Sequence, residues 1–245
     1  NYATSTNKAL EDLTSIKVDT PNDLLALSYI KQIKKHNYPI KYINIKRTTS
    51  YHGSEVLDNI TSASNIRKLY LSDNCIDNLI PFDKKYLYKI DMNKYYDILK
   101  YKILAEDTSI SKYQTVDEGI ESRIIKSIYI SNNYEKLIQN IKTKRYTYNK
   151  ISRMLLHILV GFTKEDASNI SIDYIRILGF NKRGQEYLNK IKKELSIPLV
   201  IGYKKNISKV LDIELKATKI YALVTDVSLI KREYQIKPII KENND

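Results

Sequence analysis

The chain has 245 residues, of which 42% are hydrophobic and 28% are charged, a balance typical of soluble globular proteins with one large domain or two smaller ones. Six glycines and five prolines are too few for long linkers or a turn-rich β-sandwich, so helices are expected to dominate. The formal charge of +13 favours a polyanionic partner, either nucleic acid or an anionic membrane surface. A composition rich in lysine, isoleucine, asparagine and tyrosine is also typical of AT-rich genomes, where lysine accumulates without a ligand.

The cysteine and histidine content argues against disulfide and metal sites. Cys75 is the only cysteine, which excludes an internal disulfide and a cysteine-based zinc site and favours a reducing, cytoplasmic environment. His36, His52 and His157 are too far apart in the sequence to indicate a metal cluster, so no metal ligand is assigned. No apolar run approaches the length of a membrane span, and no signal peptide is recognisable, so no membrane partner is expected.

The first part of the chain has the rhythm of an α/β domain. Apolar residues recur at helical spacing over 22–36, which predicts a helix. Ile43 and Ile45 alternate with polar neighbours, which predicts a short strand. A polar loop and a second helix follow and extend to about residue 74. Because one strand cannot form a sheet, residues 1–75 are expected to be the tail of an α/β domain.

Helical patterns dominate the rest of the chain. They are expected at 93–106, 117–131, 134–142, 149–162, 181–196 and 210–226. Pro198 ends the fifth pattern before a short apolar stretch. The second domain, residues 76–245, is therefore expected to be one α-helical domain. The expected fold class is mainly α with an α/β N-terminal piece.

The segment Ile60–Arg67, ITSASNIR, places small hydroxyl residues and an arginine where a helix begins. In one interpretation, Ser62 or Ser64 caps the helix by accepting a hydrogen bond from a backbone N–H group. In the other, free N–H groups, hydroxyls and the guanidinium of Arg67 converge on an anion. The local sequence leaves both interpretations open.

A candidate nucleotide site combines this segment with the expected strand. Ligands of α/β folds bind outside the carboxyl ends of the strands, and Arg47 and Thr48 follow the expected strand at that edge. The candidate contacts are Asn22, Arg47, Thr48, Ser62, Ser64 and Arg67. Alternatively, both arginines are surface cations and Asn22 caps its helix. No P-loop, nucleophile triad or general base is recognisable.

A strongly basic stretch extends from Lys136 to Lys164 without any Asp or Glu. Its segment KTKRYTY, residues 142–148, interleaves cations with tyrosines at an expected helix-to-helix junction. Cations neutralise phosphates and aromatic rings stack on unpaired bases, a combination suited to RNA. The candidate RNA contacts are Lys142, Lys144, Arg145, Tyr146, Lys150 and Arg153. Alternatively, the cations face water and the tyrosines pack beneath neighbouring helices.

Several blocks of the sequence resemble a known enzyme family. ITSASNIR resembles the Ile-Ser-Ser-Ala-Thr-x-Ile-Arg element of nucleotidyltransferase-like proteins, which is related to the Ser-Ser-Thr-x-x-Arg motif of adenylyl-transferring enzymes. Longer blocks resemble the tRNA(Met) cytidine acetate ligase family, in the family's order: PNDLLALSYIK, EGIESRIIK, IKTKRYTYNKISRMLLHIL, YIRILGFNKRGQEYL and DIELKATKIYAL. The resemblance covers nearly the whole chain.

The resemblance implies a bacterial enzyme that uses ATP, with Mg²⁺, to activate acetate as acetyl-adenylate and then acetylates the wobble cytidine of elongator tRNA(Met). It implies that residues 1–75 end a Rossmann-like nucleotidyltransferase domain and that residues 76–245 form a tRNA-binding domain. The residues that match the family's nucleotide-contacting regions are Asn22, Arg47, Thr48, Ser62, Ser64 and Arg67. The basic stretch then becomes the candidate tRNA contact.

The sequence also departs from the family. The family begins with an Asn-Pro-Phe-His-x-Gly-His element whose histidines grip the triphosphate, and this chain has no such element. Asp23 and Ala26 stand where the family usually has Asn and Gly. The chain is therefore expected to be the C-terminal part of such an enzyme and to be inactive alone. Two other functions fit the sequence: a non-catalytic helical RNA-binding module, or an adenylyltransferase with a small-molecule substrate. The sequence defines neither the acetate-recognising residues nor the oligomeric state.

Overall fold

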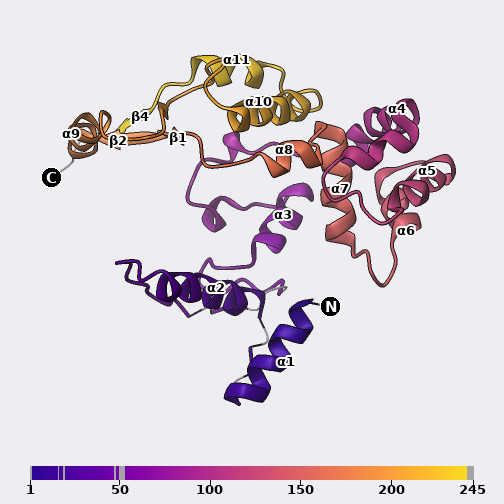
Figure 1. The fold of residues 1–245 in the computed structure, drawn as a ribbon, viewed down its shortest axis with the longest axis horizontal. Helices are drawn as coiled ribbons and strands as arrows, with labels where there is room; N and C mark the ends of the chain where they lie inside the picture. Colours follow the sequence, from indigo (N-terminus) through magenta and orange to yellow (C-terminus); the bar gives the residue numbers. More distant parts are fainter. Residues whose placement is uncertain (1, 16, 19, 47, 50–52, 242–245) are drawn as a thin grey trace. The chain divides into compact units, whose positions relative to one another are not determined.

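The computed structural model describes residues 2–15, 17–18, 20–46, 48–49 and 53–241. It divides the chain into two compact units, Asn1–Pro81 and Phe82–Asp245 (Figure 1). Helices make up most of the regular structure in the described residues of both units. The expected fold class is therefore confirmed in its coarse form, mainly α. The boundary predicted after residue 75 lies shortly before the division at Pro81.

The helices described in the first unit are α1 (Tyr2–Thr14), α2 (Pro21–Lys35), α3 (Ala63–Leu71) and a short 3₁₀ helix, η1 (Asp77–Leu79). The helix predicted over 22–36 is α2. It begins where it does because the Thr20 hydroxyl accepts a hydrogen bond of 3.1 Å from the backbone N–H of Asp23. Thr20 is thus the N-cap, and the alternative that Asn22 caps this helix is wrong.

The prediction of a strand at Ile43 and Ile45 is also wrong. Residues 39–46 contain no helix or strand, and the two isoleucines are 88% and 92% exposed. A strand needs a partner for its backbone groups. In the described part of the first unit, β pairing is limited to an isolated bridge between Leu57 and Ile60. Alternation of apolar and polar residues does not produce a strand where no partner is available.

The helices described in the second unit are η2 (Lys84–Tyr86), η3 (Met92–Tyr95), α4 (Tyr96–Glu106), η4 (Asp107–Lys112), α5 (Ile120–Ile130), α6 (Tyr134–Ile141), α7 (Tyr148–Val160), α8 (Lys164–Ser168), α9 (Lys182–Ile191), α10 (Lys209–Ala222) and α11 (Ser228–Gln235). Helices α4 to α7 surround one hydrophobic core (Figure 1). Their buried residues recur at helical spacing, as Ile120, Ile124 and Ile128 do in α5. Burial of each such isoleucine or leucine side chain contributes about 1.5–3 kcal/mol to the free energy of folding.

Four short strands in the second unit were not predicted. β1 (Ile175–Arg176) pairs in parallel with β3 (Leu199–Val200), and β2 (Gly179–Asn181) pairs in parallel with β4 (Ile239–Lys241). The second domain, expected to be α-helical, therefore also contains two short pairs of parallel strands. Strands of two or three residues are too short to show alternation, and parallel pairing joins segments far apart in sequence. Among the described helices, none is both long enough and apolar enough to cross a membrane.

Candidate nucleotide and nucleic-acid sites

An open hollow of about 900 Å³ lies in the first unit, along α2 and the irregular segment that follows it. Asn22, the candidate nucleotide contact on the first turn of α2, lines this hollow. Lys17 and Lys46 supply positive charge to its walls, and Leu27 and Ile30 supply apolar surface. The volume lies within the range of about 300–1,000 Å³ that is usual for small-molecule sites. The combination of cations and apolar surface suits a ligand with a phosphate and a flat organic part.

The two candidate residues after the expected strand are Arg47 and Thr48. Arg47 lies outside the described residues. Thr48 is described and exposed, and the next residue, Thr49, is buried and lines the hollow. Because the strand is absent, its carboxyl end no longer supports placing these residues at a nucleotide site. Support for Thr48 now comes from the next residue, Thr49, which lines the hollow.

Hydrogen bonds at the start of α3 show which residue of the ITSASNIR segment caps the helix. The Ser62 hydroxyl accepts a hydrogen bond of 3.1 Å from the N–H of Asn65 and donates one of 3.0 Å to the carbonyl of Gly53. The Asn65 side chain donates to the Ser54 carbonyl and to the Thr61 hydroxyl. Ser62 is buried, and its hydroxyl already both donates and accepts within the protein. The capping interpretation is therefore confirmed for Ser62.

Two polar residues of the segment are exposed to solvent. Ser64 and Arg67 are exposed and lie three positions apart on α3, so their side chains share a face of the helix. The N–H groups at positions 63 and 64 precede the first intrahelical bond and have no partner within the helix. This end of the helix also carries the positive end of its dipole. The chemistry suits an anion at Ser64 and Arg67, while Ser62 shapes the turn.

The basic stretch forms a bend between α6 and α7, residues 142–147, which we call the basic bend. Within it, the N–H of Tyr146 donates to the Thr143 hydroxyl over 3.1 Å, and the N–H of Thr143 donates to the Tyr146 carbonyl over 3.2 Å. The guanidinium of Arg123, on α5, donates to the carbonyls of Asn140 and Ile141 at the end of α6. These bonds hold the basic bend in one conformation against α5.

Tyr146 points into the protein. Its residue is 7% exposed, and its hydroxyl donates to the Asp117 carbonyl over 3.1 Å and to the Glu118 carboxylate over 3.3 Å. The ammonium of Lys150 lies 4.4 Å from the centre of the Tyr146 ring. Burial, followed by the charge of Glu118, raises the pKa of Tyr146 above its ordinary value of 10.0. An enclosed ring cannot stack on a base, so the prediction that Tyr146 contacts RNA by stacking is wrong. The alternative of inward packing holds for this residue.

The cations of this region face solvent. Arg145 forms an ion pair with Glu118 in which both side chains are exposed. Exposed pairs contribute only about 0–1 kcal/mol, so a phosphate can replace Glu118 as the partner of Arg145. Four further exposed cations have no ion pair with a carboxylate within the part of the chain that the structure describes: Lys142, Lys144, Lys150 and Arg153. Together they form a positive surface on and beside the basic bend.

The residues that shape the basic bend were missed by reasoning from its own sequence. Glu118 pairs with Arg145 and Tyr146, and Arg123 ties the end of α6 to α5. Both lie in the block EGIESRIIK, whose only distinction in the sequence is its resemblance to a family. That block was therefore the available signal for them.

The histidines do not form a metal site in the described residues, where no group of three or more His, Cys, Asp or Glu side chains is arranged to hold a metal ion. The ring of His36 stacks on Tyr38, with 5.3 Å between the ring centres. Nδ1 of His157 lies 2.9 Å from the carbonyl oxygen of Gln114. His52 lies outside the described residues.

Comparison with known proteins places these features in a family. The chain matches the HIGH Nucleotidyl Transferase family over residues 1–236. The tRNA(Met) cytidine acetate ligase of Clostridium perfringens (strain SM101 / Type A) is 34% identical, over 91% of this chain and 58% of the relative. The protein of the same name from Bacillus anthracis (strain A0248) is 30% identical, over 98% of this chain and 68% of the relative. The chain thus spans 58% of the first relative's length and 68% of the second's.

Solved structures show the same fold. The apo form I of Thermotoga maritima TmcAL superposes with a TM-score of 0.73 at 23% identity, covering 91% of this chain and 60% of that chain. The structure of the same protein bound with alpha-thio ATP superposes with a TM-score of 0.71, at the same identity and coverage. From the family match and the sequence relatives together, the chain belongs to the HIGH nucleotidyl transferase family and, within it, to the tRNA(Met) cytidine acetate ligase family.

Proposed function

We propose that the chain is part of an ATP-dependent ligase that acetylates the wobble cytidine of elongator tRNA(Met). In the proposed first step, the acetate carboxylate attacks the α-phosphorus of ATP, and pyrophosphate leaves as acetyl-adenylate forms. In the second, the N4 amine of the cytidine attacks the acetyl carbonyl, AMP leaves, and the amine loses a proton. The observation that carries this proposal is the identity of 30% to the Bacillus anthracis tRNA(Met) cytidine acetate ligase over 98% of this chain. A tRNA substrate also favours a cytoplasmic location.

The first unit supports the ATP half of the proposal. We assign it to the end of a Rossmann-like nucleotidyltransferase domain, with ATP lying partly in the hollow along α2. Asn22, Lys17 and Lys46 line that hollow and fit a nucleotide with its phosphates. Ser64 and Arg67 supply an anion contact at the start of α3, where charge on the α-phosphate and the departing pyrophosphate must be stabilised. A neighbour of the same fold is bound with alpha-thio ATP, which agrees with this assignment.

Magnesium is expected to accompany ATP, since it binds chiefly to phosphate oxygens and water and needs only one or two protein carboxylates. No three-residue metal cluster exists in the described residues, so no side chain is assigned to it. The hollow's cations, Lys17 and Lys46, can share the neutralisation of the phosphates.

The second unit supports the tRNA half of the proposal. The exposed cations of the basic bend and of α7 form a surface that suits a phosphate backbone: Lys142, Lys144, Arg145, Lys150 and Arg153. The fixed conformation of the bend keeps these charges in place before RNA arrives, which lowers the entropy lost on binding. An adenylyltransferase with a small-molecule substrate has no need for such a surface.

The proposed reaction is tested with the complete gene product, ATP, isotopically labelled acetate and elongator tRNA(Met). We expect labelled N4-acetylcytidine at the wobble position, dependent on both ATP and acetate, as measured by mass spectrometry of tRNA digests. A protein that binds tRNA but shows no acetate-dependent exchange between ATP and pyrophosphate would instead be an RNA-binding module.

Arg67→Gln tests the assigned anion contact. We expect it to lower acetate-dependent ATP–pyrophosphate exchange about tenfold or more while tRNA affinity stays unchanged, because the variant lacks a positioned donor to developing charge. Lys68→Gln is the control, since Lys68 is also exposed on α3 but one position along, on a different face. Equal effects of the two variants would remove Arg67 from the proposed site.

A further inference from the structure

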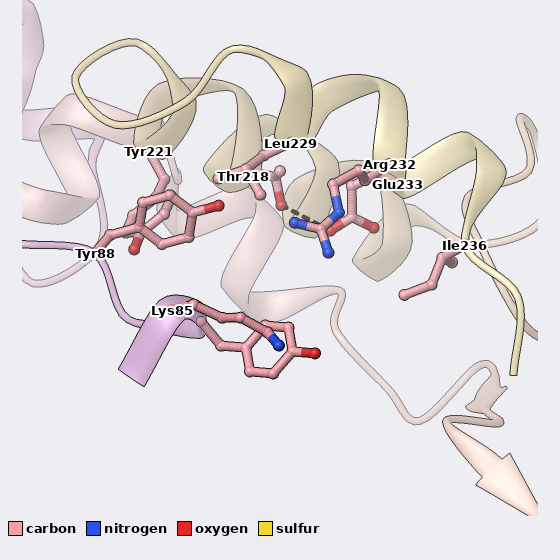
Figure 2. A pocket seen from close by; sticks show the side chains of 9 residues that line it. Lys85, Tyr88, Thr218, Tyr221, Leu229, Arg232, Glu233 and Ile236 are labelled. Carbon is pink, nitrogen blue, oxygen red and sulfur yellow. Dashed lines mark hydrogen bonds between the residues drawn. The ribbon is translucent and has the colours of Figure 1, made fainter. Parts of the chain in front are cut away.

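A second hollow, of about 520 Å³, lies within the second unit (Figure 2). Lys85, from η2, lies on one side of it, and Arg232 and Glu233, from α11, lie on the other. Tyr88 and Tyr221 lie together at one end. The family resemblance singled out none of these side chains for a role. The hollow therefore needs its own chemical interpretation.

Of the aromatic side chains of this hollow, Tyr86 is exposed, unlike Tyr146, and Tyr88 and Tyr221 are half-buried. Tyr86 is 61% exposed and lines the hollow beside Lys85, whose ammonium lies 5.1 Å from the centre of its ring. Tyr88 and Tyr221 meet edge to face, with 6.1 Å between ring centres and 89° between ring planes. Accessible tyrosine faces are the surfaces on which proteins stack unpaired bases.

Two cations stand on opposite sides of the hollow. Lys85 is exposed and pairs with Asp83 over 2.9 Å, an exposed contact that a phosphate can replace. Arg232 is exposed on α11, and its planar guanidinium is well matched to phosphate oxygens. Charges on both sides suit the two phosphates that flank a single nucleotide of a chain.

Glu233 gives the hollow a fixed hydrogen-bond acceptor. One carboxylate oxygen accepts from Arg176 over 3.2 Å and the other from the Thr218 hydroxyl over 3.1 Å, the latter drawn as a dashed line in Figure 2. Each carboxylate oxygen retains a second lone pair that can accept from a ligand. Cytosine presents an exocyclic amine to such an acceptor, whereas uracil presents a carbonyl oxygen in its place.

We propose that this hollow binds one unpaired nucleotide of RNA, with its base against the tyrosines, a base amine on Glu233 and its phosphates at Lys85 and Arg232. The inference rests on the proposed function, because the RNA in question is the tRNA substrate, and it adds a contact distinct from the basic bend. The segment DKKYLYK, residues 83–89, interleaves lysines with tyrosines, as KTKRYTY does. Here the Tyr86 ring remains available for stacking.

Fluorescence anisotropy with labelled pentacytidylate and pentauridylate at low salt tests this site in the 245-residue chain. We expect tighter binding of pentacytidylate, and a loss of about fivefold or more in its affinity for Tyr86→Ala and for Arg232→Glu, because a stacking face or a phosphate contact is removed. Lys85→Glu, a second charge reversal at the hollow, is expected to act as Arg232→Glu does.

Matched controls come from α9, outside the hollow. Tyr187 is 61% exposed, as Tyr86 is, and Arg183 is an exposed arginine, so Tyr187→Ala and Arg183→Glu repeat the chemical changes elsewhere. The controls are expected to bind pentacytidylate within about twofold of the wild type. Melting followed by circular dichroism confirms that each variant is folded.

Three results overturn the inference: no pentacytidylate binding by the wild-type chain, no preference over pentauridylate, or equal losses in the hollow variants and their controls. If tRNA acetylation is observed while the hollow variants bind pentacytidylate normally, only this inference fails. If the hollow variants lose pentacytidylate binding as expected but the complete gene product forms no N4-acetylcytidine, the proposed function fails instead.

Discussion

Tyr146 anchors the basic bend to Asp117 and Glu118. We expect Tyr146→Ala to lower the free energy of unfolding of the second unit by about 3–5 kcal/mol, because the variant lacks a buried aromatic ring. Tyr146→Phe removes only the hydroxyl bonds to Asp117 and Glu118 and is expected to cost about 1 kcal/mol. Urea unfolding followed by far-ultraviolet circular dichroism measures both. If Tyr146→Ala remained as stable as wild type and lost only RNA affinity, the Tyr146 ring would be a surface on which an RNA base stacks.

Ser62 is expected to control the stability of the loop before α3. Ser62→Ala removes the N-cap bond to Asn65 and the bond to the Gly53 carbonyl, and the loss of a cap costs about 0.5–2 kcal/mol. Amide hydrogen exchange in peptides covering 53–66 should therefore become roughly 2- to 30-fold faster. Ser64→Ala, at an exposed position of the same helix, should leave this exchange unchanged. Equal rates in the two variants would contradict the cap assignment.

Local sequence could identify tyrosines among cations as candidate RNA contacts, but it could not show whether each tyrosine is exposed or buried. KKYLY at 84–88 and KRYTY at 144–148 read alike, yet Tyr86 is 61% exposed and Tyr146 is 7% exposed. The difference arises because another segment supplies Asp117 and Glu118, which accept hydrogen bonds from the Tyr146 hydroxyl. A pattern within five residues carries no information about side chains from other segments that the fold brings into contact with it.

At the scale of elements, α8 depends on a carboxylate cap. The Asp166 carboxylate accepts from the N–H of Thr163 over 2.9 Å and from its hydroxyl over 2.8 Å, in a capping box. These bonds, the backbone one first, hold the pKa of Asp166 below its ordinary value of 3.8. Because the folded pKa is depressed, the stabilisation is fully present above the ordinary value and is lost as pH falls through the folded pKa.

Asp166→Asn is therefore expected to lower the melting temperature at pH 7, and this difference from wild type should shrink as pH falls below about 3.8. Differential scanning calorimetry between pH 7 and pH 2.5 measures it. Glu165→Gln changes the charge by the same amount at an exposed neighbouring position and should show little difference at any pH. A difference for Asp166→Asn that stayed constant with pH would contradict a role for the ionised cap.

Helices were predictable where apolar residues recur at helical spacing. The patterns over 22–36, 134–142 and 149–162 correspond to α2, α6 and α7, each within a few residues at its ends. The strand at Ile43 failed because a short alternation says nothing about a pairing partner. β2 and β4 escaped notice for the related reason that each has only three residues and pairs with a distant segment.

At the scale of the whole molecule, the excess positive charge has a specific distribution. Among the described residues, Lys142, Lys144, Lys150 and Arg153 of the basic bend and α7 lack carboxylate partners, and Arg145 has only the exposed pair with Glu118. Arg176 of β1, in contrast, is paired with both Glu214 and Glu233. The formal charge of +13 alone could not distinguish a solvated face from a binding surface. The family resemblance identified the candidate regions for ATP and tRNA, and the structure excludes Tyr146 as a stacking contact and shows Ser62 to be a helix cap.

If the exposed cations of the basic bend and α7 hold tRNA as proposed, the affinity of the chain for elongator tRNA(Met) must depend on them and on the salt concentration. We predict that Lys144→Glu with Lys150→Glu lowers the affinity about tenfold or more and reduces the slope of log affinity against log salt by roughly one for each phosphate that the protein no longer neutralises. The control, Lys182→Glu with Lys190→Glu on α9, changes the net charge equally at exposed positions and should retain most of the affinity and slope. Equal losses in the two double variants would show that only net charge matters and that the basic bend is not the tRNA contact.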